Sequence, residues 1–151
     1  MIWYCDASAL VKRYVLEEGS RWFRRQVDNH TVLISHITVV EVYAALATRR
    51  RLGTVSLFSF FQPRNNFNDH IKRRLYRVLP FTESIVSVAT SLLPHHPLRA
   101  YDAAQLATAV QYLKSYPSKR ADLIFLTADE QLEKAAVAER LMTDNPNRHR
   151  R

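Results

Sequence analysis

Short apolar runs alternate with segments of helical periodicity along this 151-residue chain, and that alternation restricts the fold more than any other feature. Each apolar run has the length of a buried strand. The predicted strands are Ile2–Cys5, Val32–Ser35, Arg77–Phe81 and Leu123–Thr127. Strands that alternate with helices predict an α/β fold, with a short, mostly parallel sheet of four to five strands flanked by helices.

The segments between the predicted strands repeat their apolar residues every three or four positions, as amphipathic helices do. The predicted helices are Ala7–Leu16, Ser20–Val27, Thr38–Arg51, Leu57–Leu75 with a break near Pro63, Glu83–Leu93, Ala103–Tyr116 and Glu130–Arg140. No repeat or long linker divides the chain, so residues 1–147 are expected to form one domain. The basic end, residues 148–151, is expected to be a mobile tail.

The composition favours a globular protein of a reducing compartment. Hydrophobic residues make up 47% of the chain, yet no apolar run approaches the roughly 18 residues of a membrane span. The apolar N-terminal run ends at Asp6 and lacks the basic start of a signal peptide. The single cysteine, Cys5, cannot form an internal disulfide. We therefore expect a cytoplasmic protein with no membrane partner.

The charge balance indicates the kind of partner. Lysine and arginine number 22 against 14 aspartates and glutamates, which gives a formal net charge of +8. A surplus of this size favours a polyanionic partner, most often a nucleic acid. Solubility alone is the alternative explanation.

Four acidic residues lie just after predicted strands or near the N-termini of predicted helices, which can face the same edge of the sheet. Asp6 comes directly after the first strand, and Asp129 follows the last one. Glu41 lies in the first turns of the helix after the second strand, and Asp102 opens the helix that begins near Ala103. Binding sites in open α/β sheets form beyond the carboxyl ends of the strands. We therefore expect the four carboxylates to meet in one pocket.

Four carboxylates in one pocket would repel each other and raise each other's pKa values, and a bound cation removes that cost. Oxygen-only ligands suit a hard ion such as Mg²⁺ or Mn²⁺. Such an ion can polarise a phosphodiester and activate a water molecule. The predicted metal ligands are Asp6, Asp102 and Asp129, with Glu41 as a further ligand or as the group that orients the water. Four carboxylates can hold one ion or two, so the number stays open.

Each acid also has an alternative role at a helix N-terminus, where acidic side chains are favoured. Asp6 and Asp102 could be simple N-caps. The segments Thr38–Glu41 and Thr127–Glu130 both match the capping-box pattern. Capping does not require the four acids to converge, whereas a metal site does. The pattern as a whole therefore favours the metal site.

Five segments of the chain resemble the motifs of PIN-domain proteins, in particular the VapC-type toxins of bacterial toxin–antitoxin pairs. They occur in the family's order as residues 2–14 (IWYCDASALVKRY), 34–42 (ISHITVVEV), 98–107 (LRAYDAAQLA), 125–132 (FLTADEQL) and 144–147 (DNPN). A single such motif would be weak evidence, whereas four ordered motifs and a matching ending are specific. The resemblance implies a PIN-like three-layer α/β fold over essentially the whole chain.

The resemblance also implies a function. Such proteins are Mg²⁺- or Mn²⁺-dependent endoribonucleases whose acidic residues match Asp6, Glu41, Asp102 and Asp129. The motifs place supporting hydroxyl groups at Ser8 and Thr127. The usual substrates are RNAs of the translation machinery, often transfer RNA. The resemblance further implies a homodimer and a VapB-like antitoxin that enters the cleft.

Three basic residues near the motifs, Lys12, Arg13 and Arg99, are predicted to contact the RNA backbone. Arg140 is the visible departure from the family, whose members often carry Gly before the final Leu of this segment. We expect Arg140 to extend the last helix by a turn.

Two other functions are weighed against a ribonuclease toxin. One is a non-catalytic RNA-binding or regulatory PIN-like module. The other is a metal-dependent phosphatase, which would require a second acid two residues after Asp6. Ser8 occupies that position, so the phosphatase is disfavoured.

Overall fold

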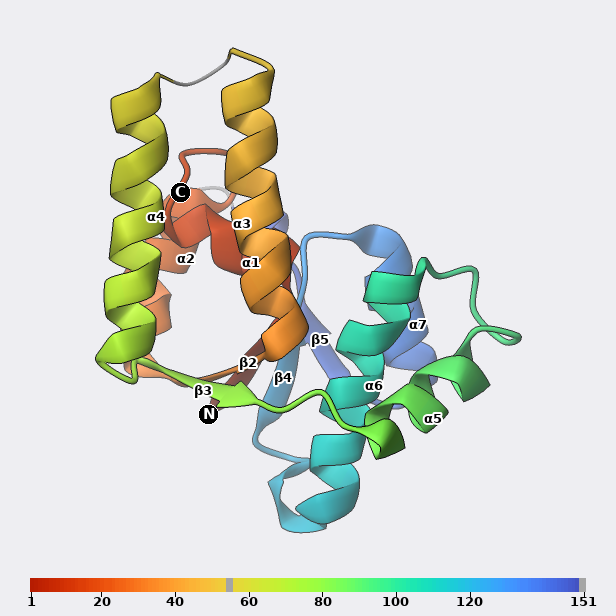
Figure 1. Cartoon of the computed structure of the whole chain (residues 1–151). Coiled ribbons are helices and arrows are strands. Elements are labelled where there is room, and N and C mark those ends of the chain that lie inside the picture. The colour runs from red at the N-terminus through yellow and green to blue at the C-terminus, as the bar shows by residue number, and fades with distance from the viewer. Residues whose placement is uncertain (54–55, 150–151) are drawn as a thin grey trace.

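A five-stranded parallel sheet forms the centre of the computed structural model, which describes residues 1–53 and 56–149 (Figure 1). The strands lie in the order β3-β2-β1-β4-β5, and each neighbouring pair is parallel. Their bounds are β1 Ile2–Cys5, β2 Thr31–Ser35, β3 Tyr76–Leu79, β4 Leu123–Leu126 and β5 Met142–Asp144. The predicted α/β class and mostly parallel sheet are confirmed.

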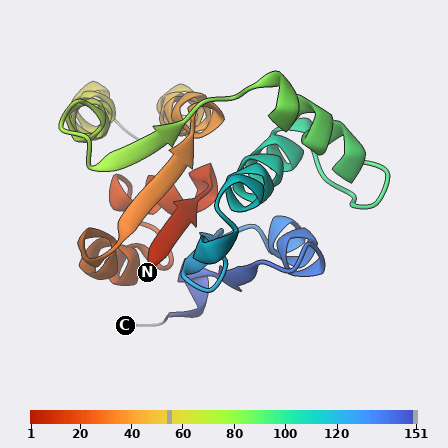
Figure 2. The same ribbon diagram turned by 90° about the horizontal axis from the view of Figure 1, so that it is seen from below.

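The helices cover both faces of this sheet, as the view from below shows (Figure 2). Their bounds are α1 Ala7–Leu10, α2 Ser20–Gln26, α3 His36–Arg51, α4 Leu57–Lys72, α5 Glu83–Leu92, α6 Ala100–Ser115 and α7 Glu130–Ala138. Short 3₁₀ turns are η1 Val11–Arg13, η2 Val27–Asn29, η3 Pro117–Lys119 and η4 Pro146–Arg148. None of the helices in the described part of the chain is long and apolar enough to cross a membrane.

Alternation along β1 explains the three layers. Successive side chains of a strand point to opposite faces of the sheet. Trp3 and Cys5 are buried in the core beneath α1 to α4, whereas Tyr4 is buried in the core beneath α5, α6 and α7. A strand that is buried on both faces has to be apolar at every position, which is the pattern that the sequence shows.

Several boundaries differ from the predicted ones. Helix α4 continues through Pro63, although a proline inside a helix removes one backbone hydrogen bond. Its apolar face packs against the sheet core through the fully buried Phe67, and that burial offsets the lost bond. The predicted first helix is α-helical only to Leu10 and then tightens into η1. Helix α6 begins at Ala100, three residues earlier than predicted.

The fifth strand was not predicted from the sequence, because Met142–Asp144 is three residues long and lacks an apolar pattern. Pairing with β4 forms it, and this pairing joins Ile124 to Met142 and Leu126 to Asp144. The chain then continues into η4. There Arg148 donates two hydrogen bonds to the buried carboxylate of Glu133, at 2.8 and 2.6 Å.

The start of the predicted mobile tail, residues 148–151, makes contacts with the rest of the domain. Arg148 bonds to Glu133, and the His149 ring stacks on Trp22 at 3.8 Å and contacts the carboxylate of Asp144. The rest of the predicted tail, residues 150–151, lies outside the described residues.

Arg140 ends the last helix rather than extending it, contrary to the prediction. Its φ angle is +62°, in the left-handed region that favours glycine. The backbone N–H of Arg140 donates to the carbonyl of Val137, and that of Leu141 donates to the carbonyl of Ala136. These bonds satisfy carbonyls at the helix end, so the turn forms even without glycine.

We expect Arg140→Gly to stabilise the protein by about 0.5–1 kcal/mol, because glycine adopts a positive φ without steric cost. Chemical denaturation monitored by circular dichroism would measure the change. Arg140→Ala is the control, since it also removes the side chain but keeps the left-handed strain. A glycine variant no more stable than the alanine variant would contradict this account.

Candidate functional site

The parallel register of β1 and β4 places the first acid beside the last motif. Cys5 pairs with Leu126, so Asp6 and Thr127 leave the sheet side by side. The backbone N–H of Asp6 donates to the carbonyl of Leu126 at 3.2 Å, and the Thr127 hydroxyl donates to the Asp6 carboxylate at 3.0 Å. Residues 121 positions apart are therefore joined at the carboxyl edge of the sheet.

Asp6 is buried, with 5% of its surface exposed. Its carboxylate accepts hydrogen bonds from the Ser8 hydroxyl and from the backbone N–H of Ala9, each at 2.9 Å, in addition to the bond from Thr127. Burial raises the pKa of Asp6 to about 7, because desolvation outweighs these hydrogen bonds, and the charge of Glu41 raises it further. The hydroxyl groups of Ser8 and Thr127 thus hold the carboxylate of Asp6 in place.

Glu41 is half-buried on α3, and it has no part in a helix cap. The capping box of α3 uses Ser35 and Thr38 instead of the predicted Thr38 and Glu41. The Glu41 carboxylate accepts a hydrogen bond from the side-chain amide of Gln105 at 2.5 Å. Burial raises the pKa of Glu41, the bond from Gln105 lowers it, and the charge of Asp102 raises it.

Gln105 is a site residue that the sequence analysis missed. It is almost fully buried on α6, where its amide also donates to Thr38 at 2.9 Å and its carbonyl oxygen accepts from Tyr4 at 2.8 Å. This network fixes the amide so that an N–H points at Glu41. A polar residue on the inner, alanine-rich face of a predicted helix was the signal available in the sequence.

Asp102 and Asp129 lie at the N-termini of α6 and α7. Asp102 is the third residue of α6, and its carboxylate accepts from the backbone N–H of Arg99 at 3.3 Å. Asp129 is the N-cap of α7 and accepts from two backbone N–H groups, at 2.8 and 2.9 Å. Burial raises the pKa of Asp102, and the charge of Asp129 raises it further. Both carboxylates therefore accept hydrogen bonds at a helix N-terminus, and the charge of Asp129 also acts on Asp102.

The four acids form an electrostatic series along one edge of the sheet. The charge of Glu41 raises the pKa of Asp6, that of Asp102 raises the pKa of Glu41, and that of Asp129 raises the pKa of Asp102. A cation would relieve this repulsion, and the oxygen-only donor set fits a hard ion. In the described part of the chain, however, no three Asp, Glu, His or Cys side chains are arranged so that they could hold one.

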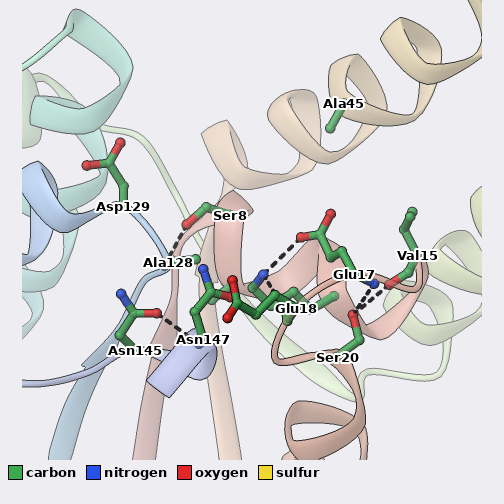
Figure 3. A network of polar contacts seen from close by, with 12 residues as sticks. Ser8, Val15, Glu17, Glu18, Ser20, Ala45, Ala128, Asp129, Asn145 and Asn147 are labelled. Atoms are coloured by element: carbon green, nitrogen blue, oxygen red, sulfur yellow. Dashed lines mark hydrogen bonds and ion pairs between the residues drawn. The ribbon is translucent and has the colours of Figure 1, made fainter. Parts of the chain in front are cut away.

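A cleft of about 630 Å³ opens beside this series. Ser8 and Glu41 line it at the acidic end, and Lys12, Glu17 and Arg49 line it elsewhere. Asn147, from the closing motif, also lines the cleft. Figure 3 shows part of this region, with the bond from the Ala128 N–H to Ser8 and the bonds around Glu17.

Two of the three basic residues predicted to contact RNA are not available for that role. The Lys12 side chain is 3% exposed, and its ammonium donates to Glu17 at 3.0 Å and to the carbonyl of Glu18 at 2.8 Å. Arg13 pairs with Asp28 at 2.7 Å and lines a different hollow on the protein. Lys12 is bound by the turn that follows it, and Arg13 is bound by Asp28 of η2. The sequence motif did not reveal these contacts.

Arg99 remains a candidate for contact with RNA. It is exposed and is the N-cap residue of α6. Its positive charge lowers the pKa of Asp102, so the guanidinium is near enough to interact with that carboxylate.

Parallel strands between two helical layers, with acidic residues gathered at one edge, define a PIN-like α/β fold. The family model described as "PIN domain" matches residues 3–138. The chain therefore belongs to the PIN-domain family. A search of curated proteins gives no match to this sequence.

Several solved structures share the fold. FitAcB from Neisseria gonorrhoeae matches at a TM-score of 0.61 and 21% identity, over 97% of this chain and 98% of that one. VapBC2 from Rickettsia felis, bound to a DNA fragment from its promoter, matches at 0.64 and 13%, over 96% and 98%. VapC20 from Mycobacterium tuberculosis, described as a sarcin–ricin loop cleaving toxin, matches at 0.61 and 16%, over 88% and 94%. The resemblance to VapC-type proteins is thus confirmed at the level of fold.

The raised pKa of Asp6 predicts that the metal-free protein loses stability as pH rises. Between the ordinary aspartate pKa near 4 and the folded value of about 7, the folded state keeps a proton that the unfolded state has lost. In EDTA at pH 8, we expect Asp6→Asn to be more stable than the parent by roughly 2–4 kcal/mol. The difference should shrink steadily towards pH 4.

Urea denaturation across this pH range would measure the effect. Asp69→Asn is the matched control, because Asp69 is exposed and its carboxylate pairs with the exposed Arg73. A difference between parent and Asp6→Asn that does not change with pH would contradict the assignment of the raised pKa to Asp6.

Proposed function

We propose that this PIN domain is a Mg²⁺- or Mn²⁺-dependent endoribonuclease and the toxin of a VapBC-type toxin–antitoxin pair. The observation that carries the proposal is the coupled acidic series of Asp6, Glu41, Asp102 and Asp129 at the carboxyl edge of the sheet. Its centre is a buried carboxylate whose pKa is about 7, which is a costly arrangement unless a cation binds there.

The residues of this site would have different roles in metal binding and hydrolysis. Asp6, Asp102 and Asp129 would hold the ion. Glu41, fixed by Gln105, would orient the attacking water, and Ser8 and Thr127 would keep Asp6 in place. The ion would polarise the phosphodiester and lower the pKa of a bound water. Attack by water leaves a 5′-phosphate on the product.

RNA of the translation machinery is the proposed substrate, with transfer RNA as one candidate. The net charge of +8 supports a polyanionic substrate. The VapC20 structure supports the same class, since its description names the sarcin–ricin loop as the target of that toxin. Such a substrate would place the activity in the cytoplasm.

We expect cleavage of RNA that requires added Mg²⁺ or Mn²⁺ and that falls roughly 10²–10⁴-fold in Asp6→Asn and Asp102→Ala. Sequencing of the 5′-phosphate ends that appear after brief expression in cells would identify the sites. Asp122→Asn is the matched control, because Asp122 is exposed and precedes β4, at the opposite edge of the sheet. Products with 2′,3′-cyclic phosphates would overturn the proposed mechanism.

A non-catalytic RNA-binding module is the second candidate. The observation in its favour is that the side chains in the described residues are not arranged to hold a metal ion. The same experiment separates the two functions. RNA binding without metal-dependent cleavage, unchanged in Asp102→Ala, would favour the module.

A VapB-like antitoxin is the proposed protein partner. The VapBC2 structure supports this proposal, since its description names a VapBC protein, the type of pair that the sequence motifs resemble. The hairpin of α3 and α4 stands away from the sheet (Figure 1) and exposes apolar side chains near its tip. They are Leu52 (71% exposed), Leu57 (55%), Phe58 (75%) and Phe61 (39%). Assembly into a homodimer stays a prediction.

We expect Phe58→Ser with Phe61→Ser to weaken antitoxin binding at least about tenfold, because exposed aromatic side chains are common anchors of interfaces. Calorimetry with the product of an adjacent antitoxin-like reading frame would measure it. Val137→Ser is the control, since Val137 is 57% exposed on α7, in the other helical layer. Unchanged affinity in the folded double variant would reject this surface.

A further inference from the structure

One side of the cleft is lined by two cationic side chains, Lys12 and Arg49, that bind the same carboxylate. Glu17 accepts from the Lys12 ammonium through Oε1 at 3.0 Å and from the Arg49 guanidinium through Oε2 at 2.5 Å. These three residues line the same 630 Å³ cleft as Ser8 and Glu41. Two cations and one anion leave a local excess of one positive charge on this side of the cleft.

The loop that carries Glu17 has a fixed shape. The backbone N–H of Glu17 donates to the Ser20 hydroxyl at 2.9 Å, and that hydroxyl donates to the carbonyl of Val15 at 2.8 Å (Figure 3). Gly19 has a φ of +76°, and a Cβ atom there would lie 2.5 Å from the carbonyl oxygen of Pro146. A fixed loop presents the Glu17 carboxylate at one place in the cleft.

The two ion pairs differ in their access to solvent. The Lys12 side chain is 3% exposed, whereas those of Glu17 and Arg49 are 28% and 29% exposed. Lys12 also donates to the carbonyl of Glu18, so its contacts are structural. A solvent-accessible ion pair contributes little net stability, because water competes for both partners. The bond between Glu17 and Arg49 can therefore be exchanged at small cost.

We propose that Arg49 binds a phosphate of the substrate RNA. In the absence of RNA, the Glu17 carboxylate occupies the position of that phosphate, and the phosphate displaces it on binding. This proposal rests on the proposed function and adds a binding residue to it. The Glu17 carboxylate presents one oxygen to each cation, as two oxygens of a phosphate would. A guanidinium that binds a carboxylate oxygen can bind a phosphate oxygen in the same way, because both are charge-assisted hydrogen bonds.

The position in the cleft favours RNA over an acidic protein segment. Arg49 lines the space that also contains Ser8 and Glu41, so a phosphate at Arg49 would place the same strand against the acidic series. The exposed apolar surface near Phe58, by contrast, lies near the tip of the hairpin and suits a protein partner. An RNA backbone is thus the ligand whose charge and position both fit Arg49.

Glu17→Gln tests the proposal, since glutamine keeps the size and an oxygen for Lys12 but removes the competing charge. We expect the variant to bind a fluorescent single-stranded RNA about three- to tenfold more tightly, as measured by anisotropy in EDTA. Glu18→Gln is the matched control, because Glu18 is exposed and offers Lys12 only its backbone carbonyl. Equal affinities of the two variants, or weaker binding by Glu17→Gln, would overturn the proposal.

Arg49→Gln provides a second test, which stands even should Glu17→Gln fail to fold. We expect weaker binding and a salt dependence reduced by about one phosphate contact. Arg50→Gln is the control, since Arg50 is exposed and lies over the Phe60 ring. In the double variant of Glu17 and Arg49, the gain from Glu17→Gln should disappear. A gain that persists, or an unchanged salt dependence, would show that Glu17 does not act through Arg49.

These measurements are independent of cleavage, because EDTA removes any metal. A change in RNA affinity in these variants without metal-dependent cleavage would support the phosphate site at Arg49 and contradict the proposed nuclease activity. Metal-dependent cleavage without that change in affinity would support the nuclease activity and contradict the phosphate site. An antitoxin whose affinity changes in Glu17→Gln while RNA affinity does not would assign the site to the protein partner instead.

Discussion

The carboxylate of Asp6 is the group on which the arrangement of the site depends. It lies at the junction of β1 and β4, where Thr127, Ser8 and the N-terminus of α1 all donate hydrogen bonds to it. Burial nevertheless raises its pKa to about 7, so the fold without a cation is less stable at neutral pH than the same fold without this charge. Sites that bind ligands often retain such costs, because the ligand relieves them.

The capping and catalytic explanations of the acids prove compatible. Asp6 and Asp129 are N-caps, and Asp102 bonds to the N-terminus of α6, so three acids hold helix ends and also face one region. For Asp6 and Asp129, parallel strands cause this coincidence, because β1 and β4 leave the sheet at the same edge and a helix N-terminus follows each. Asp102 lies at the start of α6, which follows α5. Glu41 has no cap to hold, and a buried glutamine positions it instead.

Fewer basic side chains can contact a nucleic acid than the number of lysines and arginines suggests. Lys12, Arg13 and Arg148 each pair with a carboxylate of the same domain. The net charge of a protein attracts a polyanion over long range, whereas direct contact requires a cation that can exchange its present partner for the polyanion. Burial determines whether a cation can do so. Lys12 is buried and Arg49 is partly exposed, although both bind Glu17.

The sequence alone determined the α/β class, the parallel sheet and the acidic residues at its edge. Short apolar runs indicate buried strands, and their alternation with segments of helical periodicity indicates the fold class. It did not reveal β5, which is too short to carry a pattern and exists through its pairing with β4. It also left the roles of Gln105, Glu17 and Lys12 hidden. Those roles depend on contacts between residues far apart in the chain or on the shape of a turn, and only the tertiary structure brings these groups together and decides which charges are buried.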